Sequence, residues 1–192
     1  MDKGLADVAI IPYNQRHLHD VLTLANDAFG ENYLTVERIS FLAARKGSFF
    51  VLQQGEKITG YCVFVYEAMQ DTIKHIAGLQ DLLPGDYRPD KLVCYMKSMA
   101  IAKDVKGTGA ARALFGTALA KSVADGVPMA WGSAWKIGET VPMHKIFDGF
   151  GFGVAGEVPM AWYNDENYSC VYCGGRCRCD AVIYYRDLGD SK

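Results

Sequence analysis

The fold is decided by a stretch in which an apolar strand leads through a glycine turn into a helix: Ser98-Met99-Ala100-Ile101-Ala102-Lys103-Asp104-Val105-Lys106-Gly107-Thr108-Gly109-Ala110. The apolar character of Lys91 to Ala102 predicts a buried central strand, and a helix is predicted from about Ala110 to Ala124. Free backbone N–H groups at a helix start favour a phosphate, and glycine lets the backbone approach it closely. The turn therefore predicts a phosphate site, although glycines needed only for their backbone angles would give the same pattern.

Two well-known phosphate loops do not fit this turn. A Walker loop requires Gly-Lys followed by Ser or Thr, whereas Ala110, Ala111 and Arg112 follow here. A dinucleotide-binding turn requires a small residue where Arg112 stands and follows the first strand of its unit, whereas this turn lies past the middle of the chain. These differences exclude P-loop kinases and ATPases as well as the dinucleotide-binding fold.

The elements around the turn mix strands and helices. Upstream, the pattern predicts a strand over Val8 to Ile11, a helix over His17 to Phe29, a second helix capped by Thr35, and a hairpin of Ser48 to Gln53 with Ile58 to Glu67. Downstream, it predicts a strand over Val127 to Trp135, a short helix over Val141 to Phe147, and strands over Phe152 to Tyr163 and Ala181 to Arg186. Between the hairpin and the central strand, Ala68 to Asp90 is a long excursion with a turn at residues 82–86, of the kind that often grips a substrate.

Three segments of the chain form a recognisable set. Ser98 to Ile101 is an apolar strand segment, residues 104–109 read Asp-Val-Lys-Gly-Thr-Gly, and Phe147 to Phe152 leads from a helix to a strand and ends in Gly-Phe. This set, with the element order from Val8 to about Phe152, resembles the GNAT superfamily of acetyl-CoA-dependent N-acetyltransferases, whose signature is Gln/Arg-x-x-Gly-x-Gly/Ala. Asp104 departs from the first position of that signature.

The resemblance implies a mixed α/β fold with a mostly antiparallel central sheet, flanked by helices, in a single domain. Residues 1–163 would form the acetyltransferase-like domain, and residues 164–192 would form a cysteine-rich loop and a final strand that complete the same domain. The implied activity is that of an enzyme, an N-acetyltransferase that moves an acetyl group from acetyl-CoA to an amine of a small molecule or peptide by direct attack.

The resemblance also implies where acetyl-CoA binds. The backbone of the central strand would bond the pantetheine arm, amides of the turn would hold the pyrophosphate, and the thioester would lie where the central strand and Val127 to Trp135 splay apart. The implied cofactor-binding residues are Met99, Ala100, Ile101, Lys106, Gly107, Thr108, Gly109, Ala110 and Ala111. Asp104 would place a negative charge near the pyrophosphate, which Lys103 and Lys106 would offset.

The acid and base of the reaction are open, because Phe147 stands where the family often has a tyrosine that protonates the leaving thiolate, and phenylalanine cannot donate a proton. The candidate substitutes are Ser98, through a bound water, His144, Tyr163 and Tyr184, followed by Tyr185, Glu67 and Glu139. Packing in a strand or core is the structural alternative for each of these side chains. The functional alternative is a non-catalytic domain that binds acyl-CoA in a regulatory role.

Four of the six cysteines lie close together, at Cys170, Cys173, Cys177 and Cys179. Cys-x-x-Cys-Gly is the form of a zinc knuckle, and four thiolates are what a tetrahedral structural zinc site requires. The spacing therefore favours a structural Zn²⁺ site, with an iron–sulfur cluster, a disulfide or free thiols as alternatives. A metal-stabilised interaction protein is a third possible function. Cys62 and Cys94 lie in apolar strand sequence and are expected in the core.

Composition limits the partners. The 192 residues are 50% hydrophobic and carry a formal charge of −2, so a packed core is expected and no overall field draws in nucleic acid or an anionic membrane. The longest apolar run, Tyr61 to Tyr66, is far too short to span a bilayer, and no secretion signal is recognisable. We expect a cytoplasmic protein that binds acetyl-CoA and an amine acceptor, without nucleic acid or membrane, either as a monomer or as a homodimer.

Overall fold

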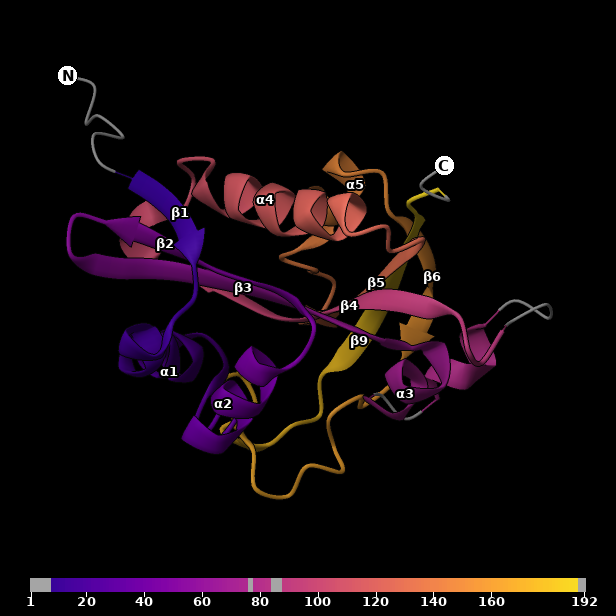
Figure 1. Ribbon diagram of the computed structural model, residues 1–192. Coiled ribbons are helices and arrows are strands. Elements are labelled where there is room, and N and C mark those ends of the chain that lie inside the picture. Colours follow the sequence, from indigo (N-terminus) through magenta and orange to yellow (C-terminus); the bar gives the residue numbers. More distant parts are fainter. Residues whose placement is uncertain (1–7, 76–77, 84–87, 190–192) are drawn as a thin grey trace.

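The computed structural model describes residues 8–75, 78–83 and 88–189. Its main feature is a seven-stranded sheet in the order β1-β2-β3-β4-β5-β9-β6 (Figure 1). The strands are β1 (Val8–Pro12), β2 (Gly47–Gln54), β3 (Lys57–Ala68), β4 (Leu92–Ile101), β5 (Met129–Lys136), β6 (Gly153–Val158) and β9 (Asp180–Asp187). Neighbouring strands are antiparallel except β4 and β5, which are parallel. The expected mixed, mostly antiparallel sheet in a single domain is confirmed.

Helices cover both faces of this sheet. α1 (Leu18–Phe29) and α2 (Val36–Ala44) lie on one face, and α4 (Ala110–Ala124) and α5 (His144–Gly149) lie on the other (Figure 1). Two hydrophobic cores result, one containing Ile39 and Tyr61 and the other containing Leu114 and Phe115. α2 begins as predicted, because Thr35 Oγ1 accepts a hydrogen bond from a first-turn backbone N–H at 3.2 Å.

The parallel strands β4 and β5 part soon after they meet. They pair at Cys94–Ala130, Tyr95–Trp131 and Met96–Gly132, whereas β4 continues to Ile101 and β5 to Lys136. The register between β3 and β4 shifts so that Val63 pairs with Ser98 but Phe64 pairs with Met96, which leaves Lys97 as an extra residue in a β-bulge. A bulge bends its strand. The splay expected between these two strands is therefore present, and it begins beside the bulge.

Two element boundaries differ from the prediction by three residues or more, and the others by one or two at most. The strand predicted over Phe152 to Tyr163 is β6, and it ends at Val158 because Pro159 lacks an N–H group and Met160 adopts a positive φ of 45°. The short helix predicted over Val141 to Phe147 is α5, and it begins only at His144. Val141 precedes a proline, and the residue before proline is disfavoured in helical conformation.

Two long connections border the region where β4 and β5 part. The first, from β3 to β4, contains α3 (Met69–Thr72) and 3₁₀ turns at Ile73–His75 and Leu79–Leu82, and most of the turn predicted at residues 82–86 lies outside the described residues. The second, from β6 to β9, carries the clustered cysteines and a small sheet of β7 (Ser169–Cys170) and β8 (Gly175–Arg176). Among the helices of the described ranges, none has the length and apolar character needed to cross a bilayer.

Candidate active site

A cleft of about 1370 Å³ lies between the separated ends of β4 and β5. Ser98 and Ala100 on β4 and Ser133 on β5 line it, and all three follow the last paired positions of these strands. Helices on both faces of the sheet also contribute, with Leu42 from α2 on one face and Ile146 from α5 on the other. The cleft therefore passes through the sheet from one face to the other.

On the α4 side, the cleft is bordered by the glycine turn. Lys103, Lys106 and Ala111 line it. Gly107 and Gly109 have φ values of 81° and 87°, and no atom lies within 4 Å of the place where a Cβ would stand at either residue. Gly109 is the N-cap of α4 and has no side chain to bond the first helical N–H groups. The N–H group of Ala110 donates to Thr108 Oγ1 at 3.4 Å. The N–H groups of this first turn and the two lysines suit an anionic group such as a pyrophosphate.

The predicted cofactor-binding residues separate into two groups. Those that line the cleft are Met99, Ala100, Ile101, Lys106 and Ala111. The others form the turn itself, between Lys106 and Ala111: Gly107, Thr108, Gly109 and Ala110. The charge of Asp104 does not oppose a phosphate here, because its carboxylate pairs with Lys57 Nζ at 3.5 Å and does not contribute to the cleft walls.

On the α1 side, aromatic side chains form one wall of the cleft. We call this set the aromatic wall, and it consists of Phe29, Tyr33, Trp135, Trp162, Tyr168 and Tyr172. Its members pack on one another, with the rings of Phe29 and Tyr33 4.2 Å apart and those of Phe29 and Trp135 5.0 Å apart. Arg38 and Asp165 also line this part and form an ion pair at 3.0 Å. Such a surface suits an amine carried on an apolar body, since aromatic faces attract ammonium groups.

Polar groups gather where the strands part. Ser98 Oγ lies 2.8 Å from Tyr61 Oη, and Tyr95 Oη lies 2.8 Å from Ser133 Oγ. Lys97, the extra residue of the bulge, also lines the cleft, and burial lowers the pKa of its ammonium group. Ser98 is therefore placed in the cleft as predicted for a catalytic candidate, although its hydroxyl is already paired with a tyrosine.

A histidine and a buried carboxylate form a pair beside these hydroxyls. The ring of His75 lines the cleft and stacks on Tyr95 with centroids 5.1 Å apart. Its Nε2 lies 2.7 Å from Glu67 Oε1, which also accepts a hydrogen bond from Thr72 at 3.0 Å, and Arg45 lies 3.1 Å from Oε2. Burial disfavours the charged form of Glu67, but these partners outweigh burial and hold the pKa of the carboxyl below its usual range. An ionised Glu67 accepts the Nε2 proton of His75, and no partner of Nδ1 is found among the described residues.

His75 and Lys97 are functional candidates that the sequence pattern does not name. His75 lies in the excursion between β3 and β4, where the pattern is weak, and its pairing with Glu67 depends on how this segment folds back on β3. Lys97 has a signal in the sequence, because it is the one charged residue between Leu92 and Ala102.

Two of the predicted catalytic residues pair with each other outside the cleft. His144 Nδ1 lies 3.0 Å from Tyr184 Oη, and the Tyr184 ring stacks on Phe147 with centroids 4.4 Å apart. Neither His144 nor Tyr184 contributes to the cleft walls. Phe147 itself is fully buried, and a Cβ on Gly132 would lie 2.6 Å from its ring tip. The residue at the family's tyrosine position therefore fills space beside the last β4–β5 pair.

The remaining candidates also lie away from the cleft walls. The ring of Tyr163 lies under the guanidinium of Arg176 at 3.9 Å, and Tyr185 stacks on Trp131 with centroids 5.5 Å apart. Glu139 is exposed in the turn after β5. Ser98 thus lines the cleft, Glu67 contacts the lining residue His75, and these three residues do not contribute to the cleft walls.

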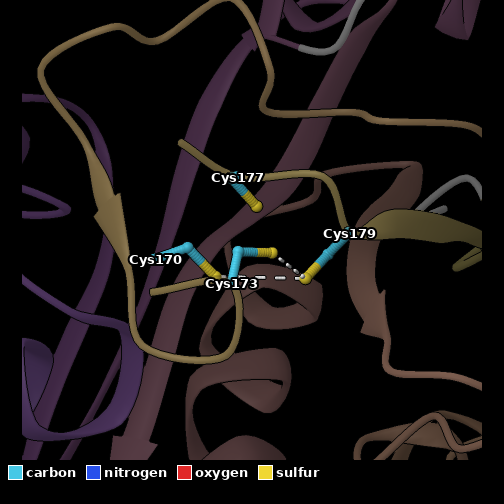
Figure 2. Close-up of side chains that lie close together, drawn as sticks. All are labelled: Cys170, Cys173, Cys177 and Cys179. Atoms are coloured by element: carbon cyan, nitrogen blue, oxygen red, sulfur yellow. Dashed lines mark hydrogen bonds between the residues drawn. The ribbon is translucent and has the colours of Figure 1, made fainter. Parts of the chain in front are cut away.

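The four clustered cysteines come together in one place. Their Sγ atoms all lie within 4.8 Å of one another, and Figure 2 shows the side chains pointing toward a common centre. Cys170, Cys177 and Cys179 are buried, and Cys173 is exposed. The remaining two cysteines, in β3 and β4, are buried in the core as expected.

The solved structures similar to this chain include N-acetyltransferases. The chain is similar to an N-acetyltransferase from Staphylococcus aureus Mu50 (TM-score 0.67, 16% identity, 95% of this chain and 99% of that chain). It is also similar to Arabidopsis thaliana NAA60 in complex with acetyl-CoA (TM-score 0.68, 12% identity, 94% and 99%) and to a ribosomal-protein-alanine N-acetyltransferase from Brucella melitensis (TM-score 0.65, 14% identity, 93% and 99%). At these low sequence identities, the structural similarity is evidence for the fold alone.

A comparison of the sequence with known protein families identifies the family. A search among curated protein sequences finds no match. Residues 18–152, however, match the family described as Acetyltransferase (GNAT) family, and these residues make up more than half of the chain. The chain therefore belongs to the GNAT acetyltransferase family, as the resemblance predicted.

Proposed function

We propose that the protein transfers the acetyl group of acetyl-CoA to a primary amine of a small molecule or a peptide by direct attack on the thioester. The observation that carries the proposal is the cleft through the sheet, which joins the glycine turn on the α4 face to the aromatic wall on the α1 face. Two substrates entering from opposite faces meet where β4 and β5 part. Acetyl-CoA supplies the activated acetyl group, and the chain supplies binding, orientation and proton transfer.

We assign removal of the amine proton to His75, directly or through one water. Glu67 Oε1 lies 2.7 Å from His75 Nε2 and accepts its proton. In this proposal Nδ1 is therefore the proton acceptor. As the amine nitrogen forms its bond to the acetyl carbon, its proton passes to Nδ1 and the carbon–sulfur bond breaks. We assign return of a proton to the thiolate to the hydroxyl pair of Tyr95 and Ser133, because His75 stacks on the Tyr95 ring and the two hydroxyls lie 2.8 Å apart. This pair would protonate the leaving thiolate, which Phe147 cannot do.

We also propose that the protein works in the cytoplasm. All six cysteines are free, including sulfurs only 3.6 Å apart, and reducing compartments keep thiols in this state. Fractionation of cells that express the full chain would test this location. The homodimer remains a prediction, which sedimentation equilibrium would decide.

Calorimetric titration with acetyl-CoA tests the first step of the proposal. We expect saturable binding that desulfo-coenzyme A competes away, because the turn and β4 hold the pyrophosphate and pantetheine rather than the acetyl group. Absence of binding at millimolar acetyl-CoA would contradict the proposed activity. It would equally contradict the alternative motivated by Phe147, a domain that binds acyl-CoA without turnover.

A further inference from the structure

We propose that Cys170, Cys173, Cys177 and Cys179 bind one zinc ion, and that this ion fixes the aromatic wall of the cleft. Four thiolates at about 2.3 Å from a tetrahedral zinc lie roughly 3.8 Å from one another. The Sγ atoms of Cys170 and Cys179 are 3.9 Å apart, and those of Cys173 and Cys179 are 3.6 Å apart (Figure 2). Two of the sulfur pairs are thus at the spacing that a single metal ion imposes, and all four sulfurs lie within 4.8 Å of one another.

The backbone around the cysteines is that of a metal knuckle. Gly174 has a φ of 64°, and its N–H donates to the carbonyl of Cys170 at 3.0 Å, which closes the turn between the first two cysteines. The N–H of Arg178 donates to the sulfur of Cys173 at 3.3 Å. N–H groups directed at sulfur stabilise thiolates.

The distances between the sulfurs also distinguish a zinc site from a disulfide and from an iron–sulfur cluster. A disulfide would bring two sulfurs to about 2.0 Å, whereas all four cysteines are free. In an iron–sulfur cluster the four thiolates are shared among two or four irons, so thiolates on different irons lie farther apart than the 4.8 Å that contains all four sulfurs here. A single tetrahedral ion is the occupant that matches both conditions.

The cysteine loop is docked against the end of α1, where the aromatic wall begins. Val171 N–H donates to the carbonyl of Phe29, and Ser169 N–H donates to that of Glu31, both at 3.0 Å. Gly30 lies between these two bonds with a φ of 110°, and a Cβ there would stand 2.0 Å from the carbonyl oxygen of Ser169. The backbone of the loop is therefore held in close contact with the chain that leaves α1.

Residues next to the cysteines are part of the cleft. Tyr168, Val171 and Tyr172 line it, and the buried cysteines form one hydrophobic cluster with Tyr168 that packs on Tyr33 and Trp135. The regular secondary structure of the long connection from β6 to β9 consists of the two short strands β7 and β8. A metal ion at its centre would fix these side chains, so this part of the inference rests on the proposed transferase activity.

Metal analysis of the full chain, purified without chelators, tests the site itself. We expect about one zinc per chain and, after exchange with Co²⁺, the visible spectrum of a tetrahedral tetrathiolate. Cys173→Ser, chosen because Cys173 is exposed, should weaken zinc binding by at least about tenfold, since even groups that only support a metal ligand contribute that much. Cys62→Ala and Cys94→Ala, which remove cysteines outside the loop, should leave the zinc content unchanged.

Several results would overturn the site. A stable chain with no metal, iron with inorganic sulfide in place of zinc, or a disulfide between two of the four sulfurs would each contradict it. So would a Cys173→Ser variant that binds zinc as tightly as the parent chain.

Steady-state kinetics test the role of the ion in the cleft. Chelation should raise the amine KM about tenfold and leave the acetyl-CoA dissociation constant unchanged, because the loop lies on the acceptor side. An unchanged amine KM in a chain shown to have lost its zinc would contradict this role. If no transfer occurs with any amine, the proposed activity fails, whereas the metal content still decides the zinc site.

Discussion

Replacing His75 with glutamine should lower kcat about a hundredfold, which is the lower range for loss of a general base. Glutamine keeps an N–H that can donate to Glu67, so the buried carboxylate retains its partner, but it has no group that accepts a proton at neutral pH. The dissociation constant of acetyl-CoA should stay within a factor of about two, because His75 lies on the connection from β3 to β4 and away from the glycine turn.

The matched control is His19→Gln, since His19 is exposed on α1 and does not line the cleft. It should leave kcat and the unfolding temperature unchanged. Comparing unfolding temperatures also separates catalysis from structure, because a purely structural His75 would lower stability without a selective loss of kcat. An unchanged kcat in a folded His75→Gln variant would remove the assigned base.

Replacing Gly109 with aspartate should weaken acetyl-CoA binding roughly thirtyfold, corresponding to about 2 kcal/mol. The new carboxylate would stand at the start of α4, where the free N–H groups and Lys106 favour a pyrophosphate, and it would both repel the phosphates and compete for the N–H groups. The kcat at saturating acetyl-CoA should change little. Calorimetric titration of the variant measures the effect.

Gly109→Asn is the matched control for this charge. Gly109 has a φ of 87°, a conformation that asparagine and aspartate tolerate to similar extents, and the two side chains have nearly the same size. The asparagine variant should therefore bind acetyl-CoA several times more tightly than the aspartate variant. Equal affinities for the parent chain and Gly109→Asp would place the phosphates elsewhere.

The fold could be predicted from the sequence because its local signals agree with one another. The glycine turn, the apolar strand before it and the helix after it predicted β4 and α4 almost residue by residue. The largest error in a predicted boundary lies where individual residues interrupt a continuing hydrophobic pattern. Apolar and aromatic residues run on to Tyr163, but Pro159 and Met160 end β6 at Val158, so hydrophobic content alone overstated the strand.

Candidate residues could be named from the sequence far more readily on the cofactor side than on the acceptor side. The predicted cofactor residues lie in two short segments, 99–101 and 106–111, so a local motif names them all. The acceptor side is assembled from α1, the β3–β4 connection and the cysteine loop, which no short-range pattern relates to one another. Glu67 and His75 illustrate this difference. They pair because the β3–β4 connection folds back onto β3, and no local sequence pattern at either residue predicts this.

The tyrosines near the end of the chain show the same limit. Tyr184 and Tyr185 are neighbours in sequence, yet alternation along β9 buries Tyr184 against Phe147 and leaves Tyr185 on Trp131. Neither side chain reaches the cleft walls. The serine hydroxyls that line the splay are those of Ser98 on β4 and Ser133 on β5. Each is paired with a tyrosine on a neighbouring strand, Ser98 with Tyr61 and Ser133 with Tyr95.

Release of coenzyme A thiol from acetyl-CoA, measured over a panel of small primary amines and peptides with free N-termini, tests the central claim most directly. We predict release that depends on the amine, saturates with it, and is accompanied by an acetylated product in the mass spectrum. His75→Gln should suppress this release at saturating acetyl-CoA. Saturable acetyl-CoA binding without amine-dependent thiol release on any member of the panel would contradict the claim and favour a domain that only binds acyl-CoA.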